Sequence, residues 1–150
     1  MSFPYCISIN SSYIYEQSTD ERINQNDAAI TLAHELGHYL GLRHVFSEGG
    51  TTSMCTDTDY CKDTPSYNRS EYEQWLNNLD KQNKYQLKDL AKRYSCEKGE
   101  YEAHNIMDYA YCFYNEITLE QRKRIRHILN YSPLIPGPKE SRIDTRGVQD

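Results

Sequence analysis

The chain has 150 residues, a net charge of −5 at neutral pH and 37% hydrophobic residues. This length predicts a single domain, and the modest apolar content predicts a small core. Acidic and basic residues are mixed, so the charge pattern does not favour nucleic-acid binding. No apolar run approaches the length of a membrane span, and no signal peptide is visible. The 14 tyrosines supply packing surface that keeps a polar end.

The first predicted elements are two short strands followed by a helix. Residues 5–9 alternate polar and apolar side chains, and residues 13–15 follow after a turn-forming Asn-Ser-Ser. A polar loop then leads to an Asn-Asp pair that can cap a helix over about residues 27–40. The helix is predicted to bury an apolar stripe with a four-residue spacing, formed by Leu32, Leu36 and Leu40.

This helix carries the sequence HELGHYLGLRH, which fits the pattern H-E-x-x-H-x-x-G-x-x-H. His34 and His38 lie on one helix face about one turn apart, so both imidazoles can reach one metal ion. On a continuous helix His44 would lie roughly 9 Å further along the axis. Gly41 can end the helix with a positive φ and turn His44 back towards the other two histidines.

Three neutral imidazoles leave one position of a tetrahedral zinc ion open for water, as a catalytic site requires. Glu35, next to His34, is placed to accept a proton from that water. The alternative is a surface helix that carries three histidines by chance. That alternative leaves Gly41 unexplained.

Residues 45–66 are predicted to form a loop rich in Gly, Thr, Ser and Asp. Its oxygen-bearing side chains have the chemistry of a calcium site, and an acidic, solvated turn is the alternative. The candidate calcium ligands are Asp57, Asp59, Asp63 and Thr64.

Two more helical segments are predicted further along the chain. The first covers residues 70–94, with Ser70 and Glu73 as a possible capping box. The second runs from Thr118, capped with Gln121, to about residue 130. Its inward-facing residues are predicted to be Ile125, Ile128 and Leu129. The remaining residues, 133–150, are rich in proline and lack helical periodicity.

Residues 104–109 read HNIMDY, in which Met107 and Tyr109 resemble the Met-turn of metzincin peptidases. Together with the histidine motif, this segment makes the chain resemble a metzincin endopeptidase, nearest to the pappalysin family. The resemblance covers about residues 27–132 and is interrupted by an apparent helical insertion over 66–98. Further matching segments are Val45-Phe46 after His44, DYCKDTP at residues 59–65 and Thr118-Leu119-Glu120-Gln121.

The resemblance implies an α+β, zincin-type catalytic domain over residues 1–132, with a zinc helix, a Met-turn and a C-terminal helix, followed by the tail at 133–150. Such domains place a sheet and a long helix ahead of the zinc helix. Only 33 residues precede His34, so we expect most of the upstream sheet to be absent.

In function, the resemblance implies a zinc-dependent endopeptidase that acts on proteins or peptides. Tyr109 would stabilise the oxyanion, Met107 would pack beneath the histidines, and a structural calcium would lie near the DTP segment. Family members that prefer basic residues carry acids after the Met-turn. Here that segment reads Ala110-Tyr111-Cys112, which does not favour a basic preference. We expect a monomer.

Five cysteines in a hydrophilic chain predict an oxidising, extracytoplasmic setting. Cys6 stands apart, and the other four lie after the zinc helix. The residues alone leave three pairings open, as well as buried free thiols. The resemblance implies the pairs Cys55–Cys96 and Cys61–Cys112.

Two other functions stay open. One is a catalytically weak zinc-binding fragment that acts as a binding module, which the short N-terminal region favours. The other is a zinc hydrolase of a different fold that shares only H-E-x-x-H. The third histidine and the Met-turn argue against the second alternative. His104, beside the Met-turn, is expected to be a hydrogen-bonded structural residue.

Overall fold

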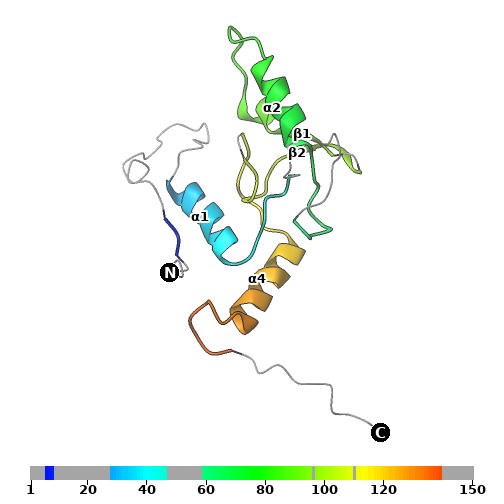
Figure 1. Ribbon diagram of the computed structural model, residues 1–150. Helices are drawn as coiled ribbons and strands as arrows, with labels where there is room; N and C mark the ends of the chain where they lie inside the picture. Colours follow the sequence, from blue (N-terminus) through cyan, green and yellow to red (C-terminus); the bar gives the residue numbers. More distant parts are fainter. Residues whose placement is uncertain (1–5, 9–27, 47–58, 96, 110, 140–150) are drawn as a thin grey trace.

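A computed structural model describes residues 6–8, 28–46, 59–95, 97–109 and 111–139 of the chain (Figure 1). Its elements are, in chain order, α1 (Ala28–Tyr39), α2 (Arg69–Asn77), α3 (Leu87–Leu90), β1 (Lys92–Ser95), β2 (Gly99–Glu102) and α4 (Leu119–Tyr131). Strands β1 and β2 form an antiparallel hairpin. Helices with a small antiparallel sheet agree with the predicted α+β class.

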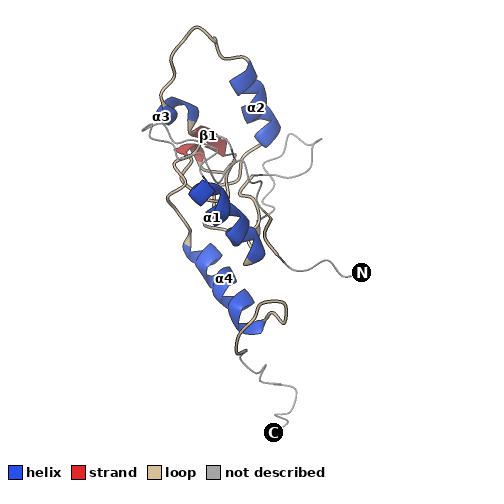
Figure 2. Cartoon of the chain, turned by 90° about the vertical axis from the view of Figure 1, so that its left-hand side faces the viewer, coloured by secondary structure: helices blue, strands red, loops and turns tan. Residues whose placement is uncertain are grey.

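Along the long direction of the molecule, α2, α3 and the hairpin lie at one end and α4 lies at the other, with α1 between them (Figures 1 and 2). The strands predicted over residues 5–9 and 13–15 lie almost wholly outside the described residues, and residues 6–8 are not in a strand. Within the described ranges, no helix is long and apolar enough to cross a membrane.

Helix α1 forms where the sequence predicted a helix, but its buried face is not the predicted one. The buried residues are His34 and Gly37. Leu32 and Leu36 are 47% and 43% exposed, and only Leu40 of the predicted leucine stripe is half-buried, so the stripe is wrong. The helix turns its histidine and glycine side towards the loop that carries Met107, which leaves the leucine side facing away from the described core.

The described residues pack into two small hydrophobic cores. The first, here called the aliphatic core, consists of Leu42, Val45 and Met107, with Ile106 and Ile125 against it. The second, here called the aromatic core, consists of Phe46, Tyr67 and Tyr72, with Leu76 and Tyr101 against it.

The segment predicted as one helix over residues 70–94 divides into α2, α3 and β1. Asn68 caps α2, since its side-chain oxygen accepts a hydrogen bond from the Glu71 amide at 3.3 Å. The predicted Ser70–Glu73 capping box is therefore wrong. Beyond α2, the Asp80 side chain and carbonyl accept hydrogen bonds from the amides of residues 82 and 83, which forms a turn. A side chain of this kind stabilises a turn in competition with a continuing helix.

The predicted capping box of α4 is confirmed. The Gln121 amide donates to the Thr118 hydroxyl at 3.3 Å, and the Thr118 amide donates to the Gln121 side chain at 3.0 Å. Ile125 and Ile128 are half-buried, whereas Leu129 is exposed and does not face inward as predicted. Residues 133–139 contain no helix, as expected for the tail.

Candidate metal centre

Helix α1 ends at Tyr39, two residues before Gly41, the residue near which its end was predicted. The φ of Gly41 is +86°. The Leu42 amide donates to the Gly37 carbonyl and the Gly41 amide donates to the His38 carbonyl, both at 2.9 Å. These two bonds form a Schellman C-cap, which requires a left-handed residue at the position of Gly41. The chain therefore reverses direction immediately after α1.

The turn is also held against α4. A Cβ atom on Gly41 would lie 2.7 Å from Cγ1 of Ile128. The Gly41 carbonyl accepts a hydrogen bond from Nε of Arg124 at 2.5 Å. Gly41 thus meets two requirements, a positive φ and the close approach of a second helix, and only the first was predicted from the sequence.

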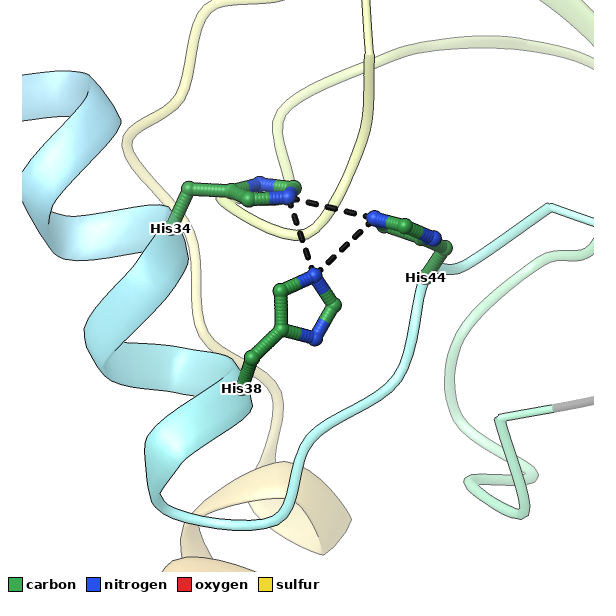
Figure 3. A group of neighbouring side chains, drawn as sticks. All are labelled: His34, His38 and His44. Carbon is green, nitrogen blue, oxygen red and sulfur yellow. Dashed lines mark hydrogen bonds between the residues drawn. The ribbon is translucent and has the colours of Figure 1, made fainter. Parts of the chain in front are cut away.

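This turn brings His34, His38 and His44 together (Figure 3). The Nε2 atom of His34 lies 3.2 Å from those of His38 and His44, and the last two are 3.0 Å apart. Two nitrogen ligands at 2.0–2.1 Å from a tetrahedral zinc ion would be about 3.3 Å apart. The three imidazoles therefore already have nearly the spacing that such an ion requires.

Two of the three rings are held by backbone carbonyls through their other nitrogen. Nδ1 of His34 lies 2.8 Å from the Ile106 carbonyl, and Nδ1 of His38 lies 3.0 Å from the Leu42 carbonyl. Each Nδ1 must carry a proton to donate, so each Nε2 presents a lone pair to the common centre. Lone pairs that face one another at this distance repel, and a shared cation relieves the repulsion.

The electrostatic surroundings of His34 favour its neutral form. Burial lowers the pKa of His34, the Ile106 carbonyl opposes this, and the neighbouring His38 and His44 lower the pKa further. A neutral imidazole is the form that binds metal. The donor set therefore fits zinc in its chemistry as well as in its spacing.

Met107 forms the floor beneath α1. It is fully buried, and a Cβ atom on Gly37 would lie 2.4 Å from the Met107 sulfur. Only a residue without a side chain allows this approach. Gly37 was missed in the sequence analysis, although a glycine inside a helix, adjacent to a candidate ligand, could have indicated such a contact.

The loop that carries Met107 is tied to α4 by a buried amide pair. Asn105 Nδ2 donates to Gln121 Oε1 at 2.8 Å, and Gln121 Nε2 donates to Asn105 Oδ1 at 3.1 Å. Asn105 Oδ1 also accepts from the Met107 amide at 2.9 Å. Gln121 therefore caps α4 and anchors the Met107 loop, and only the first role was predicted.

Tyr109 lies beside the histidines. Its ring centroid is 4.4 Å from that of His44 and 5.3 Å from that of His34. The guanidinium of Arg69 lies 4.6 Å from the centroid of the same ring. Glu35 is half-buried on α1, next to His34 in the chain. The structure therefore brings Tyr109 to the centre.

The candidate calcium ligands make hydrogen bonds to the protein itself. Asp59 accepts the Cys61 amide at 2.9 Å on one carboxylate oxygen and the Thr64 hydroxyl at 2.7 Å on the other. Asp63 accepts the Glu120 amide at 2.9 Å, at the start of α4. Asp57 lies outside the described residues. The three described candidates form a turn and a helix cap, and their contacts give the calcium prediction no support.

The predicted pairing of Cys61 with Cys112 is wrong, because both are free, buried thiols. Cys61 donates a hydrogen bond to the Asp59 carbonyl and Cys112 donates to the Asn105 carbonyl, so each thiol has its own backbone acceptor. Burial raises the pKa of Cys61 to about 11 and that of Cys112 to about 12. Cys55 and Cys96, the other predicted pair, lie outside the described residues.

His104, expected to be structural, makes a hydrogen bond at 3.0 Å to the side chain of Asn115 through its Nδ1. Its ring stacks on Phe113 at a centroid distance of 4.7 Å. These contacts confirm that it takes part in the packing of the loop before α4.

Comparison with known proteins identifies the family. The family model described as pregnancy-associated plasma protein-A, peptidase family M43, matches residues 5–130. An extracellular metalloprotease of Arthroderma benhamiae is 37% identical over 108 residues, which are 70% of this chain and 32% of that protein. Proteins of the same name from Trichophyton verrucosum and Arthroderma otae are also 37% identical over 108 residues, covering 70% of this chain and 32% and 33% of those proteins.

The chain spans about a third of the length of these curated relatives. No solved structure matches it. The match to the family model nevertheless extends over most of the chain and includes α1, the three histidines, the Met107 loop and nearly all of α4. The chain therefore belongs to the pappalysin family of metallopeptidases, peptidase family M43.

Proposed function

We propose that this chain carries the catalytic centre of a zinc-dependent endopeptidase that hydrolyses peptide bonds in proteins or peptides. The observation that carries the proposal is the convergence of three imidazole Nε2 atoms at 3.0–3.2 Å. Family membership and the metalloprotease name of the relatives support it. The relatives are named extracellular, which supports an extracytoplasmic location for this chain as well.

Each residue of the centre has one proposed role. Zinc held by His34, His38 and His44 would polarise the scissile carbonyl and lower the pKa of water. Glu35 is not a ligand, and it accepts a proton from the attacking water and passes it to the departing amine. The Tyr109 hydroxyl donates to the carbonyl oxygen as negative charge develops on it.

The segment after Tyr109 is proposed to shape the pocket for the substrate side chain. It contributes Tyr111, which is exposed, and Cys112, which is buried. Neither residue carries a negative charge at neutral pH, so we propose no preference for basic substrates. Residues 66–98 are proposed as an insertion within a catalytic domain that covers residues 1–132.

The experiment that tests the proposed function starts with metal content. One zinc ion should bind per chain, measured by atomic emission after dialysis. His44→Ala should weaken zinc binding by more than about 100-fold, since the loss even of an outer-shell partner can cost that much. His127→Ala is the matched control, because His127 lies exposed on α4. Equal affinities in the two variants would contradict the three-histidine centre.

Cleavage of a mixed peptide library, with and without a chelator, tests the chemistry. Glu35→Gln should keep its zinc and its fold while cleavage falls by at least about two orders of magnitude. Tyr109→Phe should give a smaller loss, because the metal still stabilises the carbonyl oxygen. A chain that binds zinc but cuts no peptide, alone or extended upstream, would instead be a zinc-binding module.

A further inference from the structure

Arg93 is a fully enclosed cation. It comes from β1 and is 2% exposed. Its guanidinium carbon lies 3.6 Å from the centroid of the Tyr72 ring and 5.1 Å from that of the Tyr67 ring. A buried guanidinium is costly unless partners satisfy its donors. The position of those partners therefore indicates why the residue is there.

The guanidinium joins two parts of the chain. Nη2 donates to the carbonyls of Tyr109 and Tyr111, at 3.1 and 3.0 Å. Nη1 donates to the carbonyls of Leu90 and Lys92, at 2.9 and 3.2 Å, within the proposed insertion. One rigid, planar group thus holds the segment that follows Met107 at a set distance from the hairpin.

The counter-charge of Arg93 is Asp108, whose Oδ2 lies 3.6 Å from Nε of Arg93. Oδ1 of Asp108 accepts the Tyr67 hydroxyl at 2.5 Å and the Tyr109 amide at 2.7 Å. The two members of this ion pair therefore hold both backbone groups of Tyr109, Asp108 its N–H and Arg93 its carbonyl.

We infer that Arg93 is a positioning residue that holds Tyr109 against the metal-binding histidines. The backbone of Tyr109 is fixed from the hairpin side, while its ring lies 4.4 Å from that of His44 on the other side. The effect on catalysis rests on the proposed role of Tyr109. A displacement of about 1 Å at a catalytic group can cost about 100-fold in rate.

Arg93→Lys is the informative variant. A lysine keeps the positive charge opposite Asp108, but its ammonium cannot donate to both carbonyls through one planar fork or stack flat on Tyr72. Arg126→Lys is the matched control, since Arg126 lies exposed on α4. Hydrogen exchange measured by mass spectrometry reports on the loop without any need for activity. Exchange over residues 105–114 should rise at least about fivefold more than exchange over α4 in Arg93→Lys, and should not change in Arg126→Lys.

The kinetic test is a double-mutant cycle with Tyr109→Phe, measured as kcat on a peptide that the unmodified chain cleaves. Arg93→Lys should lower kcat at least about tenfold with zinc content unchanged. In the Tyr109→Phe background the same change should lower kcat less than about twofold, because the hydroxyl that it misplaces is already gone.

Three results would overturn the inference: no local change in exchange, no loss of kcat, or the same fold-loss in both backgrounds. The last result would show that Arg93 supports the fold in general and does not act through Tyr109. If neither the unmodified chain nor a version extended upstream cleaves any peptide, the proposed function fails. Exchange over residues 105–114 then still decides whether Arg93 holds the loop.

Discussion

The two hydrophobic cores of this protein differ in the residues that determine their packing. Around the aliphatic core, two glycines determine the packing. Gly37 allows the close approach of the Met107 sulfur, and Gly41 allows that of Ile128. Around the aromatic core, a buried cation and aromatic rings set it, with Arg93 against Tyr67 and Tyr72. His34 and His38 of the metal centre come from the glycine-bearing helix α1, whereas His44 stacks on Phe46 of the aromatic core. The backbone of Tyr109 is held from the aromatic side.

The difference predicts two kinds of vulnerability. A core that depends on the absence of a Cβ atom is damaged by adding a single methyl group, since nothing in a closely packed interior can move aside cheaply. A core that depends on a buried ion pair is damaged by removing one partner, because the other charge is left without compensation. Substitutions in each core should therefore distinguish the two kinds of destabilisation.

The largest effect is expected from Arg93→Met. It leaves Asp108 buried without its counter-charge, and breaking a buried pair in this way costs about 3–5 kcal/mol in the free energy of unfolding. Urea unfolding measures the change. Arg126→Met, on the exposed face of α4, should remain within about 0.5 kcal/mol of the unmodified chain. A loss below about 1 kcal/mol in Arg93→Met would show that the aromatic rings alone hold this core.

The loss of stability in Arg93→Met should depend on pH. Burial is the largest influence on the pKa of Asp108 and raises it above its usual 3.8, against the opposing effect of Arg93, Tyr67 and Tyr109. A group whose pKa is raised by folding contributes stability below its unfolded pKa and loses that contribution as pH rises through the folded pKa. Without Arg93, which lowers the pKa of Asp108, that pKa rises further. The difference in unfolding free energy between Arg93→Met and the unmodified chain should thus be smaller at about pH 4 than at about pH 7.

On the aliphatic side, Gly41→Ala should cost about 2–4 kcal/mol, since backbone strain of about 1–2 kcal/mol adds to overpacking against Ile128. The two contributions can be separated. In a background of Ile128→Ala the overpacking disappears and the strain remains, so the further loss caused by Gly41→Ala should fall to about 1–2 kcal/mol. Thermal unfolding of the four proteins gives both values. Equal losses in the two backgrounds would assign the whole effect to φ.

Zinc should stabilise the segments that carry the histidines and Met107 more than it stabilises α2. At a free concentration about 100 times its Kd, a ligand that binds only the folded state contributes about 2.7 kcal/mol. Hydrogen exchange with and without a chelator should slow most over residues 28–46 and 104–109, and least over α2. Equal protection along the chain would mean that the two cores unfold as one unit.

The smallest effect is expected from Gly37→Ala. Alanine in a helix interior is favoured over glycine by about 0.5–1 kcal/mol, while overpacking against Met107 costs about 1–3 kcal/mol. We expect a net loss of about 0.5–2 kcal/mol, measured by thermal unfolding. In a background of Met107→Ala the overpacking is removed, and the same change should become neutral or stabilising. A stabilising effect in the unmodified background would show that the Met107 sulfur moves aside at little cost.

The local features could be predicted from the order of residues. The positions of α1 and of the α4 cap, the turn at Gly41 just after α1 and the convergence of His34, His38 and His44 were all predicted. These features depend on helical spacing, on a positive φ and on a cap, each of which operates within about ten residues. Features that depend only on nearby residues can therefore be predicted from the sequence.

Which faces are buried and which distant groups meet depends on the tertiary packing. The four-residue spacing of Leu32 and Leu36 predicted a buried stripe, but both residues are exposed, because the opposite side of α1 packs on Met107. Nothing in the order of residues distinguished Arg93 from the surface cations. Its contacts with the segment after Met107 lie 15 to 18 residues away, at Asp108, Tyr109 and Tyr111, and exist only once the hairpin folds against that segment. Burial is a property of the whole packing arrangement, so a periodic pattern can indicate an apolar face without showing whether anything covers it.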